Sequence, residues 1–195
     1  AFEPLQARAW LVQGALQADR GAYAEAEATL ERAYASALGL KMMPEAAEAA
    51  RSLVFVVGDR LARHEDGRRW GTHAEPLTRA AGIAGAEAPL LDGLGAVARR
   101  EGMLDQARAD HERALAIKTE LLGPDHLSLA STLTSLGIVA LMQGQLDQAR
   151  AHQERALAIF EAALGPDHPP LATTPTGPGA AAQEGKKLDQ ARAHY

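Results

Sequence analysis

The chain contains no cysteine, which excludes disulfide frameworks and thiolate metal sites. Aromatic residues make up only 4% of its 195 residues, so a core must be built mainly from alanine and leucine. Runs of β-branched residues, which favour strands, are scarce, whereas alanine is the best helix former and lets helices approach closely. The composition therefore predicts an all-α protein.

Basic charge is also not in excess. The formal net charge is −5, so the chain lacks the concentrated basic surface that binds nucleic acid through its phosphates. No apolar run approaches the roughly 20 residues needed to cross a bilayer, and residues 1–4 lack the charged-then-apolar pattern of a signal peptide. We expect a cytoplasmic protein with neither a nucleic-acid nor a membrane partner. Because the chain does not begin with methionine, we also expect it to be a piece of a longer protein.

One hexapeptide, Leu-Asp-Gln-Ala-Arg-Ala, occurs three times, beginning at Leu104, Leu146 and Leu188. Both intervals are 42 residues long (146 − 104 and 188 − 146). The first two copies extend over 104–126 and 146–168, with 17 identities in 23 positions. A fixed period of this length is typical of stacked helical repeats. Such an array forms a surface for holding a partner.

Hydrophobic periodicity divides the chain into helix hairpins that together form one solenoid over residues 1–168. The four hairpins span about 4–38, 44–82, 86–122 and 127–164. Glycine marks the turn inside a hairpin, because it adopts the left-handed conformation that ends a helix at little steric cost. The turns are expected at Gly21, at 65–67, at Gly102 and at Gly144.

The second hairpin fits the helical pattern less well than the others. The second hairpin is irregular, since Leu53–Val57 would also suit a buried strand, and Gly71 and Pro76 weaken a helix. We interpret it as helical because the adjacent hairpins need a neighbour to cover their apolar faces.

In the first hairpin, the same periodicity predicts which residues face inward. They are Leu5, Ala9, Trp10, Leu16, Tyr23, Ala26, Leu30, Ala33 and Leu38.

Residues 169–195 keep the register of the repeat but lose part of its core. Pro175 and Pro178 stand where the preceding repeat has Leu133 and Leu136. An interior proline costs about 3 kcal/mol in a helix, so we predict that Pro170–Gly179 is a loop or a broken helix. This last, degenerate repeat is truncated at the end of the chain, which predicts an apolar face without a cap.

The hairpins resemble the tetratricopeptide repeat in the longer form found in kinesin light chains and many bacterial proteins. The resemblance rests on the Leu-Gly step, the turn glycine, the Glu-Arg-Ala-Leu segment and Gly-Pro-Asp-His at the repeat boundary. It implies a right-handed α-solenoid of antiparallel hairpins that acts as a protein or peptide interaction scaffold. The first half also resembles regions that follow the kinase domain in some bacterial serine/threonine kinases. This implies an alternative role, a structural or regulatory spacer that docks on its parent enzyme or self-associates through the uncapped C-terminal end.

His126 and His168 are the best candidates for a metal or catalytic site, because each follows Pro-Asp at the same repeat position. Equivalent residues of a solenoid lie about two packed helices apart, at roughly 8–10 Å each, which is too far for one metal ion. We expect Asp125 and Asp167 to have a local structural role, either capping the helices that begin beside them or forming the turn before those helices. No motif points to a catalytic residue, a cofactor or a metal, so we expect a protein that is not an enzyme.

The resemblance also places a candidate binding groove. In the family, the first helix of each hairpin lines the concave face, and kinesin-light-chain-like repeats often carry an asparagine pair there. These positions hold Asp92-Gly93 and Thr134-Ser135 in this sequence, and other candidates lie farther along the same helices. The predicted partner-binding residues are Asp92, Arg99, Arg100, Thr134, Ser135, Ile138, Leu141 and Met142.

Overall fold

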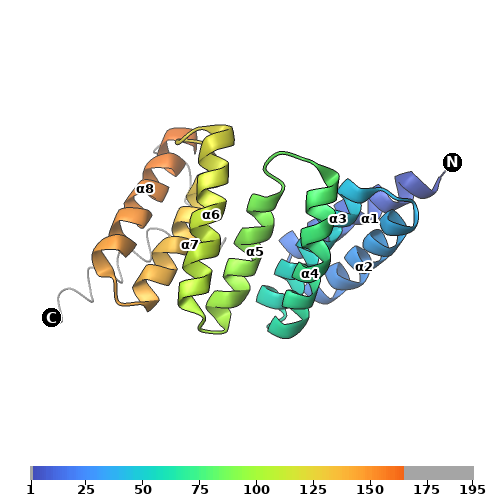
Figure 1. Cartoon of the computed structure of the whole chain (residues 1–195), viewed down its shortest axis with the longest axis horizontal. Helices are drawn as coiled ribbons and strands as arrows, with labels where there is room; N and C mark the ends of the chain where they lie inside the picture. The colour runs from blue at the N-terminus through green and yellow to red at the C-terminus, as the bar shows by residue number, and fades with distance from the viewer. Residues whose placement is uncertain (1, 165–195) are drawn as a thin grey trace. The chain divides into compact units, whose positions relative to one another are not determined.

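A computed structural model describes residues 2–164, and these residues are helical apart from short connections (Figure 1). The chain divides into two compact units, residues 1–103 and 104–195, and the boundary falls inside the third predicted hairpin. Unit 1 contains α1 (Glu3–Asp19), α2 (Tyr23–Gly39), α3 (Met43–Leu53), the π-helix η1 (Val54–Arg60), α4 (His64–Ala81) and α5 (Glu87–Arg100). Unit 2 contains α6 (Leu104–Leu122), α7 (Leu127–Met142) and α8 (Leu146–Leu164). The prediction of an all-α protein is confirmed for this part of the chain.

Three of the four predicted turns are confirmed. Gly21, Gly102 and Gly144 have φ values of 79°, 78° and 75°, which lie in the left-handed region. At each of them one helix ends two residues before the glycine and the next helix begins two residues after it. The helix boundaries at 104, 122, 127, 146 and 164 are those expected from the repeat.

The inward face of α1 differs from the predicted one. Ala7, Leu11 and Gly14 are buried, whereas Leu5 and Leu16, which we expected in the core, are exposed. Gly14 explains the difference, because a Cβ atom there would lie 2.6 Å from the Cγ atom of Leu30. The large side chain of the second helix fills the space beside a small residue of the first.

Other inward predictions for the first hairpin have mixed outcomes. Ala26, Leu30 and Ala33 of α2 are buried as expected. Ala9 and Leu38, by contrast, are exposed. In α2 the residue before Leu38, Ala37, takes the buried position and packs with Ala7 and Ala46.

The turn predicted at 65–67 is wrong. η1 ends at Arg60 and α4 begins at His64, and Ala62 takes the left-handed conformation with a φ of 55°. Gly67 lies in the first turns of α4, where a Cβ atom would overlap the Cα atom of Gly58. This glycine therefore allows two helices to touch through their backbones and does not end a helix.

The helical interpretation of the valine-rich segment is confirmed. Val54, Val56 and Val57 are fully buried in η1, a π-helix that continues α3 without a break. Short π-helical segments inside α-helices often occur at functional sites. α4 also continues through Pro76, and Ala74 and Thr78 on either side of it are buried.

In unit 2, α7 packs between α6 and α8. Ala107 and Ala149 of the repeated hexapeptide are fully buried, while Asp105 and Asp147 are exposed. Asp125 lies in the turn before α7, which is one of its two expected roles, and the N-cap residue is His126. Its Nδ1 atom accepts a hydrogen bond from the backbone N–H of Ser128 at 3.2 Å. The predictions for Asp167, Pro170–Gly179 and 169–195 lie outside the described residues.

The contact between Gly58 and Gly67 leads to a test of helix packing. Replacement Gly67→Ala should lower the free energy of unfolding by about 1–3 kcal/mol, because the overlap with backbone atoms can only be relieved by moving a helix. Gly39→Ala is the matched control, since open space surrounds that position and its φ is not positive. Urea unfolding of the full chain would measure both variants. Equal stabilities for the two variants would contradict this account.

The cap of α7 leads to a second test. His126→Ala should lower the free energy of unfolding by about 0.5–2 kcal/mol, because the N–H of Ser128 loses its acceptor. His126→Asn should recover most of this loss, since asparagine is a strong N-cap residue. If asparagine and alanine destabilise the chain equally in thermal unfolding, the ring nitrogen has no capping role.

Candidate binding surface

Three arginines converge on one buried carboxylate in unit 1. Asp59, in the last turn of η1, is only 5% exposed. Its Oδ1 atom accepts a hydrogen bond from Nε of Arg100 at 2.9 Å and lies 3.6 Å from Nη2 of Arg99. Its Oδ2 atom lies 3.5 Å from Nε of Arg60. We call these four residues the arginine cluster.

The arginine cluster has an excess of two positive charges, since it contains three guanidinium groups and one carboxylate. Burial lowers the pKa of Arg99; Asp59 opposes this effect, and the positive charges of Arg100 and Arg60 add to it. Arginine nevertheless stays charged in proteins. The cluster is therefore a partly desolvated positive site inside a chain whose net charge is −5.

Arg60 is held in place but incompletely satisfied. Its guanidinium carbon lies 4.6 Å from the centre of the Phe55 ring and 5.9 Å from that of Tyr23. Its Nε atom is buried and has no hydrogen-bond partner among the described residues. A buried donor without an acceptor costs free energy.

The cluster brings together Arg99 and Arg100, which the sequence predicted, with Asp59 and Arg60, which it did not. One feature of the sequence could have revealed Asp59, namely its separation of 41 residues from Arg100. This is close to the length of one repeat, so the two residues occupy corresponding ends of neighbouring first helices. Opposite charges one repeat apart could have identified the pair.

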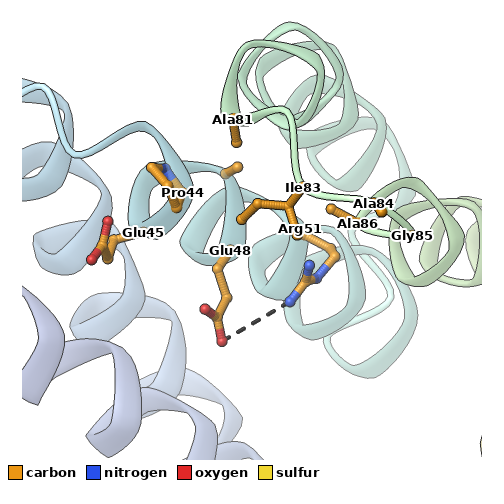
Figure 2. A pocket seen from close by; sticks show the side chains of 10 residues that line it. Pro44, Glu45, Glu48, Arg51, Ala81, Ile83, Ala84, Gly85 and Ala86 are labelled. Carbon is orange, nitrogen blue, oxygen red and sulfur yellow. Dashed lines mark ion pairs between the residues drawn. The ribbon is translucent and has the colours of Figure 1, made fainter.

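A pocket lies near the beginning of α3, where the connection from α4 to α5 crosses it (Figure 2). Its volume is about 410 Å³, and Pro44, Ala81 and Ile83 form part of its apolar wall. The side chain of Arg51 is 25% exposed, and its one ion pair in the described structure is a 4.0 Å contact with Glu48. Burial lowers the pKa of Arg51, and Glu48 opposes this effect. The pocket thus offers a second partly desolvated guanidinium on the same continuous helix as Asp59.

The remaining predicted site residues differ in accessibility. Asp92 is half-buried on α5, between the pocket residue Ala86 and the arginine cluster. In unit 2, Thr134 is fully buried and its hydroxyl donates to the carbonyl oxygen of Ala130 at 2.9 Å, so it does not belong to an accessible surface. The hydroxyl of Ser135 donates to the carbonyl oxygen of Ser131 at 3.2 Å.

Ile138, Leu141 and Met142 form an apolar end of α7 in unit 2. The first two are half-buried, and Met142 is 51% exposed. Leu141 packs beside Ala140 and Ala149. The predicted residues therefore fall into two groups, a mainly charged group in unit 1 and a mainly apolar group in unit 2.

A family model described as tetratricopeptide repeat matches residues 86–162 and 136–195. These matches together cover residues 86–195, more than half of the chain. The chain belongs to the tetratricopeptide repeat (TPR) family. No curated protein sequence matches this TPR chain significantly.

Solved structures show the same solenoid fold. BtubC (BKLC) from P. vanneervenii is 21% identical, with a TM-score of 0.67, and the match covers 92% of this TPR chain and 73% of that chain. A kinesin-light-chain-like protein from Podosopora anserina with nearly identical TPR-like repeats is 17% identical, with a TM-score of 0.69 and coverages of 96% and 87%. Its Q17M form is 16% identical, with a TM-score of 0.70 and coverages of 100% and 89%. The predicted all-α TPR solenoid is confirmed.

Family membership gives the coarse function. TPR proteins are generally protein-interaction scaffolds without catalytic activity. In the part of the chain that the structure describes, no three His, Asp or Glu side chains gather in a way that could hold a metal ion. None of the helices described combines the length and hydropathy that a bilayer span requires.

The arginine cluster leads to a stability test. Asp59→Asn should lower the free energy of unfolding by about 1–3 kcal/mol, because three guanidinium groups lose their shared counter-charge. The loss should be smaller at 1 M salt than at low salt, since salt screens the interactions of partly exposed charges. Guanidinium chloride would obscure this effect, so urea unfolding at two salt concentrations is the measurement. A loss that is independent of salt would show that the carboxylate acts through packing and hydrogen bonding alone.

Proposed function

We propose that this TPR chain is a non-catalytic scaffold that binds an acidic segment of a partner protein on the face formed by α3, η1 and α5. The observation that carries the proposal is the arginine cluster, in which three arginines share one carboxylate. A partner carboxylate would supply the missing negative charge. The coarse role as an interaction scaffold follows from the family, and the acidic partner is our specific addition.

Arginine is suited to this task because its planar guanidinium group pairs with a carboxylate through two parallel hydrogen bonds. Partial burial strengthens such bonds, since the charges are less screened by water. Arg99 and Arg100 also lie in the last turn of α5, where the helix dipole favours positive side chains and helps to keep them in place. The partner side chain would therefore meet donors that are already oriented.

The Arg51 pocket supports an extended partner segment. Arg51 precedes Asp59 by eight residues of continuous helix, which corresponds to about 12 Å along the axis. An extended chain advances roughly 3.3 Å per residue. Two acidic residues about four positions apart would therefore reach the pocket and the arginine cluster together.

Titration of a labelled peptide tests the proposal. A 12-residue peptide of glycine and serine with glutamates at positions 4 and 8 should bind, and the corresponding glutamine peptide should bind at least about 10-fold more weakly. Fluorescence anisotropy at low and physiological salt would measure both. Equal affinity for the two peptides would refute an acidic partner.

Variants locate the binding site. Arg99→Gln combined with Arg100→Gln should weaken binding of the glutamate peptide by about 10–100-fold. Arg20→Gln combined with Arg32→Gln is the control, because it removes the same charge from the exposed C-cap residue of α1 and an exposed position of α2 and should have little effect. Lysines at 99 and 100 should give intermediate affinity, since they keep the charge but lose the paired hydrogen bonds. Similar losses in both glutamine variants would mean that net charge, and not the cluster, attracts the peptide.

A further inference from the structure

The arginine cluster contains more positive charge than one partner carboxylate would neutralise. Its three guanidinium groups and the single carboxylate of Asp59 leave an excess of two charges. A glutamate or aspartate of a partner carries one negative charge, so one positive charge would remain. A phosphorylated serine or threonine carries about 1.5 to 2 negative charges at pH 7. The charge of a phosphate group therefore matches the excess more closely than the charge of a carboxylate does.

The hydrogen-bond donors of the cluster favour the same ligand. Arg100 donates to Asp59 through Nε, and the ion pair of Arg99 with Asp59 uses Nη2. Within the described residues, the two terminal nitrogens of Arg100 have no acceptor. A phosphate monoester has three acceptor oxygens, which can take a pair of hydrogen bonds from one guanidinium group and another from its neighbour.

Part of the cluster is open to such a ligand. The side chain of Arg100 is 46% exposed, and that of Arg99 is 20% exposed. Arg60 lies against the ring of Phe55 and its Nε atom is buried, so its contribution is mainly its charge. A phosphate group would therefore approach from the side of Arg99 and Arg100.

The Arg51 pocket lacks this excess of positive charge. Glu45 and Glu48 line it together with Arg51, and Figure 2 shows the ion pair between Glu48 and Arg51. Glu45 is bonded to Arg8, so these four side chains carry no net charge. A doubly charged phosphate would meet two carboxylates there. Of the two sites that an extended partner segment would reach, only the arginine cluster has the charge for a phosphate group.

We propose that the arginine cluster recognises a phosphorylated serine or threonine of the partner segment, while an ordinary acidic residue of the same segment enters the Arg51 pocket. The inference rests on the proposed function, because it assumes the same segment on the same face of unit 1. An unphosphorylated hydroxyl side chain would leave the excess charge of the cluster uncompensated. Phosphorylation of the partner would therefore strengthen the complex.

Four labelled peptides test the proposal by fluorescence anisotropy. The glycine-serine peptide with two glutamates is the reference, and the corresponding glutamine peptide is the neutral control. In the other two peptides, phosphoserine replaces either the first or the second glutamate. At the position that meets the cluster, phosphoserine should lower the Kd at least about 10-fold relative to glutamate. At the position that meets the pocket, it should change the Kd by less than about 3-fold, because the carboxylates there oppose a second negative charge.

Two results with these peptides would overturn the phosphate proposal. One is the absence of a gain at either position. The other is an equal gain at both positions, because net charge alone would then explain the binding. The comparison of the glutamate and glutamine peptides judges the proposed function separately. If the glutamate peptide still binds more tightly than the glutamine peptide, the acidic partner stands although the phosphate proposal fails.

Variants of one arginine locate the effect. Arg99→Gln reduces the excess of the cluster from two charges to one, so the gain from phosphoserine should fall below about 3-fold, while glutamate remains preferred over glutamine. Arg99→Lys keeps the charge and should retain part of the gain. Arg32→Gln, at an exposed position of α2, is the matched control and should keep the whole gain. A gain that survives Arg99→Gln unchanged would mean that the phosphate binds elsewhere, which would also overturn the proposal.

Discussion

Close approach between helices is the constraint on which the described structure depends. With few aromatic residues, the core is filled by alanine, valine and leucine, and the shortest helix contacts require glycine. Leu30 fits beside Gly14, and Gly58 meets Gly67 with no room for a Cβ atom. Gly67 was predicted to form a turn, but it lies in α4, where it is the small residue that lets two helices touch. The alanine at position 62 takes the left-handed conformation in its place.

Regular spacing of the helices also decides which charged residues meet. Ion pairs in unit 1 join residues separated by nearly one repeat: Arg8 with Glu45, Glu27 with Arg63, and Asp59 with Arg100. Most of these pairs are balanced and lie on exposed surface, where an ion pair contributes little stability. The arginine cluster differs because Asp59 is buried and three guanidinium groups share it. This excess of positive charge is the observation on which the proposed acidic partner rests.

The repeat pattern also decides which helix faces are buried and which remain exposed. Residues that face a neighbouring helix in every repeat are small and apolar, as Ala107 and Ala149 illustrate. α1 keeps this inward face with Ala7, Leu11 and Gly14, whereas Leu5, Val12 and Leu16 on its other side are exposed.

The sequence by itself determined the helical class, the repeat period, most helix boundaries and the buried alanines, because these depend on local propensity and on a pattern repeated along the chain. It also predicted Arg99 and Arg100 as candidate binding residues, and the structure places both beside Asp59. Only the tertiary structure decided which of two apolar rows of α1 faces the core, that Gly67 packs and does not turn, and that Thr134 is inaccessible. The same holds for Asp59 and Arg60, whose role arises from contact with α5. The physical reason is that an alanine-rich helix can bury more than one face, and the choice is made by the shape and charge of the helix that packs against it.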